Sequence, residues 1–327
     1  MIDGAFHMRA ADRWRQVRDR PSTQRVIACV RRVLLIAVIG YLIYKLTQVG
    51  WEQVIENLPA SPLFYLFFVL RFFALPLSEI PAYERVWGVK LWRHVTAFVR
   101  KRVYNFAVMG YSGEAFFTLW ARRHLGLSDI DVLKGVKDNN ILSAFASNLA
   151  TVALIVALAA GDKLQAGLDA LPGAVALFSL AFLSSFVLVA AVMLFGRRVL
   201  HVDRRTALDL IFIHGVRMVV VMALHAAMYA AALPTVEYVA WFIFIALQLV
   251  LSRIPFLPNQ DLVFLGAALS LASVSGAPEA AIAGMLVAEA GLSQLFNFAL
   301  FFATAHDARE VPTSEPNEKA AGADGEA

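Results

Sequence analysis

A carboxylate stands beside two glycines in the middle of an apolar run, NFAVMGYSGEAFFTLW, at residues 105–120. Gly110 and Gly113 permit a tight turn, and the charge of Glu114 suits the N-terminus of a helix that starts there. A broken helix is tolerated at membrane depth only inside protein or beside water, and its free N–H groups attract anions. The segment therefore predicts a binding site, although a simple helix cap at Glu114 with glycines used for packing explains it as well.

Two arginines lie within apolar runs, where a charged side chain must be paired or hydrated. Arg71 lies near the middle of residues 62–81, and Arg217 lies inside a later run of the same kind. An internal arginine–glutamate clamp that holds helices in register is one interpretation; an anion site is another, and the two are compatible. Glu289, near the middle of the last apolar run, is the expected partner of one arginine. Two deep arginines against one deep glutamate leave a positive charge that a phosphate would suit.

A polar stripe is predicted on residues 207–232. At about 100° per residue, His214, Arg217 and His225 fall within about 80° of one another and should face the protein interior. The two histidines have neither the spacing nor the nearby carboxylate of a metal site. We expect each to form a hydrogen bond between helices, and we predict neither a bound metal nor a cofactor.

The residue pattern argues against enzyme chemistry. The run Gly110-Tyr111-Ser112-Gly113-Glu114 has glutamate where the nucleophile elbow G-x-S-x-G needs its last glycine. Cys29 is the single cysteine, so neither a disulfide framework nor a cysteine metal cluster can form. We therefore predict that the chain is not an enzyme.

A second break interrupts the apolar pattern at SRIPFLPNQD, residues 252–261. Pro255 and Pro258 end the helical pattern there, and Asp261 follows them. Paired interruptions in the two halves of a membrane protein are the best sequence indication of a transport site. A plain loop between two spans is the alternative.

The composition places all of these residues in a membrane. Of 327 residues, 59% are hydrophobic and 17% are charged, against about 45–50% and about 25% in soluble domains. Because a span needs about 20 apolar residues, we predict an all-α, polytopic transmembrane helix bundle with about 7–8 spans and one or two re-entrant segments. The predicted spans are 33–49, 62–81, 139–160, 172–195, 207–232, 237–253 and 280–304. The segment 255–275 fits either a short crossing or a re-entrant pair.

The distribution of charge predicts the orientation. Four basic stretches hold 22 of the 29 Lys and Arg, and by the positive-inside rule they and the N-terminus lie in the cytoplasm. These stretches are residues 1–32, 82–102, 121–138 and 196–206. Because basic stretches flank 103–120 on both sides, that segment should enter and leave on the cytoplasmic face as a re-entrant segment.

Three regions follow from this pattern. Residues 1–32 form a basic cytoplasmic arm, residues 33–305 a single transmembrane domain, and residues 306–327 an acidic tail whose composition predicts disorder. The sequence pI of about 9.3 reflects topology and contact with anionic lipids, and we predict no nucleic-acid partner.

The sequence resembles the flippase-like membrane family that includes the transmembrane part of lysylphosphatidylglycerol synthases. The resemblance covers about residues 33–305 and lies in Gly113-Glu114 followed by LWARRHLGLS, and in the late proline-rich break followed by a helix after SGAPEAAIAG. The family pattern at the first motif is roughly Pro-x-Arg-x-Gly-Glu, whereas Met109 and Tyr111 stand where proline and arginine are expected. At the second motif Asn259 and Gln260 replace glycines, with Asp261 in the place of the acid.

The resemblance implies a multi-pass protein of the inner (plasma) membrane that moves or binds lipid. Our first hypothesis is a lipid translocase in which a polar head group crosses along a hydrated path. The residues predicted to bind the head group are Arg71, Gly113, Glu114, His214, Arg217, Asp261 and Glu289. The alternatives are a non-catalytic subunit that supports a partner enzyme of lipid synthesis and, less favoured, an intramembrane lipid-modifying enzyme.

Overall fold

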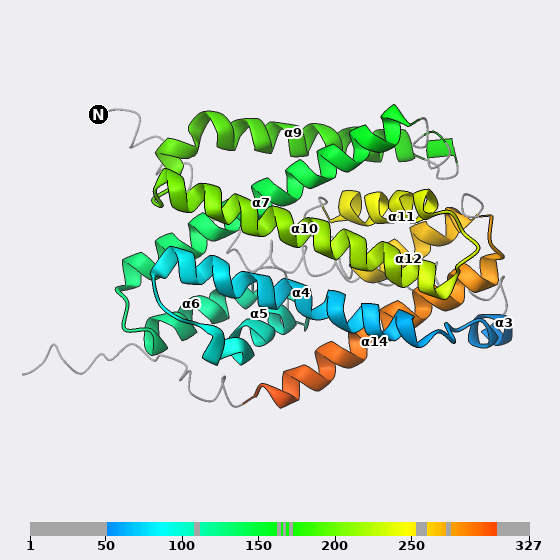
Figure 1. Cartoon of the computed structure of the whole chain (residues 1–327), viewed down its shortest axis with the longest axis horizontal. Coiled ribbons are helices and arrows are strands. Elements are labelled where there is room, and N and C mark those ends of the chain that lie inside the picture. The colour runs from blue at the N-terminus through cyan, green and yellow to red at the C-terminus, as the bar shows by residue number, and fades with distance from the viewer. Residues whose placement is uncertain are drawn as a thin grey trace, which may run out of the picture. The chain divides into compact units, whose positions relative to one another are not determined.

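The computed structural model describes residues 51–107, 112–161, 165, 168, 169, 173–252, 260–272 and 276–305. All regular structure in these residues is helical, which confirms the predicted all-α class (Figure 1). The helices are α3 (Trp51–Glu56), α4 (Pro62–Trp87), η1 (Trp92–His94), α5 (Val95–Ala107), α6 (Ser112–His124), α7 (Asp129–Ala160), α9 (Ala174–Val199), α10 (Arg204–Ala232), α11 (Tyr238–Leu251), α12 (Gln260–Ser270) and α14 (Glu279–Ala303). The predicted span 33–49, the basic arm and the acidic tail lie outside the described residues.

Five of the described helices are long and apolar enough to cross a membrane, and they make the chain a multi-pass membrane protein by length and composition. They are α4, α7, α9, α10 and α14, which match the predicted spans 62–81, 139–160, 172–195, 207–232 and 280–304. Helix α11 is different. Its 14 residues extend about 21 Å, short of a hydrocarbon core of about 30 Å, so the predicted span 237–253 is a helix too short to cross.

The chain divides into two compact units, and the division falls inside each of the five long helices. The described residues of the first unit lie within 51–70, 148–191 and 222–292, and those of the second lie within 71–147, 192–221 and 293–305. Between residues 51 and 305, 16 of the 18 Lys and Arg belong to the second unit. The basic stretches that predict the cytoplasmic side therefore belong to one compact unit, apart from the N-terminal arm.

Helix α10 exposes apolar side chains on one face and buries polar side chains on another. On α10 the side chain of Phe212 is 71% exposed and that of Val219 is 63% exposed, whereas His214, Arg217 and His225 are all buried. Exposed bulky apolar side chains suit contact with lipid, and polar groups in such a helix must face protein. The predicted polar stripe on residues 207–232 is confirmed.

Two pairs of short helices complete the units. Helices α5 and α6 pack against each other and belong wholly to the second unit; we call them the charged helix pair. Helices α11 and α12 also contact each other and belong wholly to the first unit; we call them the apolar helix pair. Each of α5 and α6 has 13 residues, about 20 Å, which is too short to cross a membrane.

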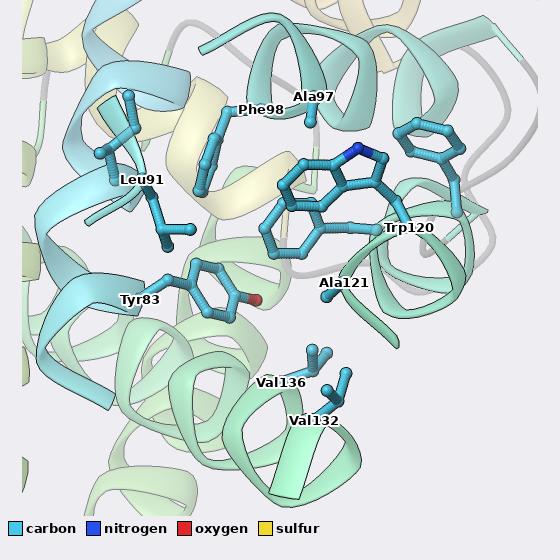
Figure 2. Packing of buried hydrophobic residues seen from close by; sticks show 11 residues of the cluster. Tyr83, Leu91, Ala97, Phe98, Trp120, Ala121, Val132 and Val136 are labelled. Atoms are coloured by element: carbon cyan, nitrogen blue, oxygen red, sulfur yellow. The ribbon is translucent and has the colours of Figure 1, made fainter. Parts of the chain in front are cut away.

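An aromatic core holds the charged helix pair in the second unit. Figure 2 shows Tyr83 of α4, Phe98 of α5 and Trp120 of α6 converging, with Val132 and Val136 of α7 beneath them. The Phe98 and Phe117 rings lie 4.7 Å apart, and the Tyr83 and Phe117 rings 4.8 Å apart, which is contact distance for aromatic pairs. This core fixes the spacing of α4, α5 and α6, and that spacing brings their polar side chains together.

Candidate functional site

A buried lysine connects three helices of the second unit. Lys101 of α5 is 2% exposed, and its Nζ lies 2.9 Å from Oε2 of Glu79 on α4 and 3.6 Å from Oε1 of Glu114 on α6. Burial would lower the pKa of this ammonium, but the negative charge of Glu79 and then of Glu114 outweigh burial, so the pKa is raised. Lys101 therefore carries its charge at neutral pH and holds two carboxylates on neighbouring helices.

The glycine of the Gly-Glu motif is required by close backbone approach. A Cβ added at Gly113 would collide with the backbone carbonyl oxygen of Lys101 and with the side chain of Asn105. The Gly113 N–H donates to Oδ1 of Asn105 at 2.7 Å, so α5 satisfies one of the open donors at the start of α6. The predicted role of Gly113 in close packing is confirmed, and its N–H is already occupied by protein.

Glu114 lies in the first turn of α6, as a helix cap would, but its carboxylate also makes tertiary contacts. Oε1 accepts a hydrogen bond from Nδ2 of Asn105 at 3.2 Å in addition to its ion pair with Lys101. Oε2 is buried and has no hydrogen-bond partner in the described part of the chain. A buried carboxylate oxygen without a donor is a place where a ligand group or a water molecule would be stabilised.

Two polar contacts one turn apart join α7 to α10 in the same unit. Nε2 of His214 lies 3.0 Å from Oδ1 of Asn139, and Nη2 of Arg217 donates to Oγ of Ser143 at 3.2 Å. The first contact confirms the interhelical hydrogen bond expected for His214. Because Asn139 and Ser143 are spaced i, i+4 and His214 and Arg217 are spaced i, i+3, both contacts occur along one seam.

Arg217 has fewer partners than a buried guanidinium needs. It is the fourteenth residue of the 29-residue α10, near the middle of a membrane span, and it is only 6% exposed. Its one hydrogen bond in the described part of the second unit goes to a neutral hydroxyl, and it forms no ion pair with a carboxylate there. The nitrogens that remain are not among the atoms sealed inside protein without a partner. Arg217 can therefore still donate to a small anionic group or to water.

A second buried cation of this unit, Arg100, forms hydrogen bonds with the C-terminal end of α14. Arg100 is buried, and it donates to the carbonyl oxygen of Phe301 at 3.1 Å, to Oγ1 of Thr304 at 3.2 Å and to the hydroxyl of Tyr104 at 3.2 Å. The C-terminal carbonyls of α14 supply the negative end of a helix dipole, which explains a guanidinium without a carboxylate here.

The first unit contains a smaller polar cluster around Glu289. The Tyr229 hydroxyl donates to Oε2 of Glu289 at 2.7 Å, and Nε2 of His225 lies 3.3 Å from Oε1. Glu289 thus has two partners on α10 that the sequence pattern did not suggest for it. The expected pairing of Glu289 with Arg71 or Arg217 stays a prediction.

The predicted residues are distributed between the two units. Gly113, Glu114, His214 and Arg217 lie in the second unit, as does Arg71 on the same helix as Glu79. Glu289 lies in the first unit, as does Asp261 in the first turn of α12, where the side chain is outside the described residues.

Sequence reasoning missed the residue at the centre of the site, Lys101. The cluster RKR at residues 100–102 was interpreted as part of a basic loop, although Lys101 and Asn105 share a helix face at i, i+4 spacing. Its five companions Glu79, Tyr83, Asn105, Asn139 and Ser143 were likewise not predicted as site residues. Among the described residues, no group of three or more His, Cys, Asp or Glu could hold a metal ion.

No protein family model, no characterised protein and no solved structure matches the chain. The resemblance to the flippase-like family therefore rests on the two short motifs alone.

Proposed function

We propose that the chain binds the anionic head group of a polar membrane lipid in the second unit and moves it across the membrane. The observation that carries the proposal is Arg217, buried at mid-span with a single hydrogen bond to a neutral group. A charged side chain in that position is costly unless something pairs with it, and a phosphate oxygen would do so.

The charges around Arg217 nearly balance one another, so the feature that favours an anion is the uncommitted donor capacity of Arg217 itself. Lys101 is shared by Glu79 and Glu114, so these three groups carry a net charge of minus one. The charge of Glu79 acts on Arg217, which brings the local total close to zero before a ligand arrives.

Movement requires that the polar head group lose water gradually. The uncommitted donors of Arg217 can replace part of the hydration shell while the acyl chains stay in the bilayer. Helix ends inside the bilayer, such as the start of α6, supply further dipoles. The resemblance of the Gly113-Glu114 motif to a flippase-like family points to the same activity.

The test is reconstitution of the full chain into liposomes that contain head-group-labelled lipids. We expect labelled head groups of at least one lipid class to move between leaflets faster than in protein-free liposomes, and Arg217→Gln to remove most of the excess. Val219→Leu, on the lipid-exposed face of the same helix, is the matched control and should behave like wild type. No movement above protein-free liposomes with any of several lipid classes would reject the proposal.

A further inference from the structure

A hollow of about 530 Å³ lies in the second unit, and none of the buried polar residues described above lines it. It is lined by Val89, Lys90, Trp92, Arg93, His124 and Leu125. These residues come from the turn after α4, from η1 and from the end of α6, so helix ends rather than helix middles form it. Its lining contains cationic and apolar side chains and no carboxylate.

The two cations of the hollow have no counter-ion in the described part of the chain. Lys90 and Arg93 are exposed; Nε of Arg93 donates to Nε2 of His94 at 3.0 Å, and neither residue forms an ion pair there. The nearby Arg122 differs, because Asp129 binds its guanidinium through both carboxylate oxygens. The charge of Arg122 is therefore neutralised by Asp129, whereas the charges of Lys90 and Arg93 remain available to a ligand in the hollow.

The backbone around the hollow is held in place. Leu91 is fully buried, and its N–H donates to Oε1 of Glu84 at 2.6 Å, which fixes the turn between Lys90 and Trp92. The His94 ring lies edge-on against Trp120, with 5.1 Å between ring centroids. These contacts within the protein limit the ordering that ligand binding at the hollow requires.

The apolar lining indicates a ligand with an apolar part. Trp92 is 56% exposed although it flanks the hollow, and Val89 and Leu125 line the same space. Exposed tryptophan beside lysine and arginine is typical of the membrane interface, where the ring lies at head-group level and the cations contact lipid phosphate. The hollow also belongs to the unit that holds nearly all basic residues of the described helices.

We propose that this hollow binds the phosphate of an anionic phospholipid from the leaflet that faces the basic loops. Lys90 and Arg93 contact the phosphate, while Trp92 and Leu125 contact the upper part of the acyl chains. This lipid is a resident ligand at the surface, separate from any lipid handled at Arg217, so the proposal does not depend on the proposed function.

The test uses the full chain in detergent with added phosphatidylglycerol, followed by native mass spectrometry. We expect wild type to retain phosphatidylglycerol in preference to phosphatidylcholine, and Lys90→Gln with Arg93→Gln to bind it about tenfold more weakly. The matched control removes the same charge at Lys134 and Arg204, which are exposed in the same unit, and should bind as wild type does.

A second readout places the lipid at the tryptophan. Phosphatidylglycerol with brominated chains should quench the emission of wild type more than brominated phosphatidylcholine does, and Trp92→Phe should remove the difference. Equal loss of binding in the Lys134 and Arg204 control would show a diffuse surface attraction and would overturn the proposal. Displacement of the lipid by inorganic phosphate at equal concentration would show a free-phosphate site and would overturn it as well.

Discussion

The charged helix pair and the apolar helix pair each consist of two short helices in contact, but different interactions hold them together. In the charged helix pair, Lys101 connects α5 to α6 through Glu114, and aromatic rings pack behind it. In the apolar helix pair, α11 buries Trp241, Phe244 and Leu247, and no charged residue lies within Tyr238–Leu251. Short helices can therefore be held by an enclosed ion pair, as in α5 and α6, or by the burial of apolar side chains, as in α11.

The difference extends to the long helices around each pair. The second unit buries Arg100, Lys101 and Arg217, whereas the described residues of the first unit include no Lys or Arg. In the first unit Glu289 is satisfied instead by a tyrosine and a histidine. Buried Lys and Arg are therefore concentrated in the second unit, which also contains the basic loops and the proposed ligand sites. The following four experiments test this contrast.

The largest expected effect is at Lys101. Lys101→Met leaves the partly buried Glu79 and Glu114 without their shared cation, and we expect the unfolding free energy to fall by about 3 kcal/mol. The measurement is thermal or denaturant unfolding in detergent. Adding Glu79→Gln to Lys101→Met should restore part of the loss, because it removes one unpaired charge. If the double variant is less stable than Lys101→Met, the ion pair is not what holds the charged helix pair.

The corresponding change in the first unit should cost less. Tyr229→Phe removes one hydrogen bond to Glu289 and leaves His225 in place, so we expect a loss of about 1.5–3 kcal/mol in the same assay. The companion variant His225→Gln tests the second partner of Glu289 in the same assay. A loss for Tyr229→Phe above that for Lys101→Met would contradict the contrast between the units.

Glycine positions compare packing in the two units. Gly113→Ala in the charged helix pair and Gly284→Ala on α14, where a Cβ would collide with the backbone of Asn57 and Val54, should each cost about 1–3 kcal/mol. Gly291→Ala is the control, since a Cβ there meets nothing within 4 Å, and it should be neutral or slightly stabilising. Equal stability of all three variants would show that the close approaches at Gly113 and Gly284 do not contribute to stability.

The smallest expected effect is on stability at low pH, through a carboxylate at the start of α10. The Asp203 carboxylate accepts the Thr206 N–H at 2.6 Å, and this hydrogen bond lowers its pKa below 3.8. A lowered pKa in the folded state stabilises the fold above pH 3.8, and that contribution is lost as pH falls through the folded pKa. Asp203→Asn should therefore lose less stability than wild type on acidification. Identical pH profiles of the unfolding midpoint would contradict this.

The sequence predicts the long elements well because apolar length is a local signal. The runs that contain Arg71, Arg217 and Glu289 are each long helices in the structure, and the stripe of His214, Arg217 and His225 is buried as its angular spacing requires. The short helices were harder to predict. Residues 237–253 have the composition of a span, and only the early end of α11 at Leu251 shows that the helix is too short.

The centre of the site was not predictable in the same way. Lys101 lies in a run of three basic residues that resembles a solvated loop, and nothing local distinguishes it from Arg100 or Arg102. Its burial depends on Glu79, 22 positions earlier, and on the aromatic core that brings α4 against α5. Contacts of this kind depend on tertiary packing, which periodicity does not report.

One residue attaches α6 to α5 from both its backbone and its side chain. The carbonyl of Lys101 packs against Gly113, and the ammonium of Lys101 reaches the carboxylate of Glu114, the very next residue. Asn105 adds one hydrogen bond to each of those two neighbours, so the start of α6 is bound to one face of α5. A displacement of Glu114 would therefore also change the environment of Glu79, because Lys101 pairs with both carboxylates.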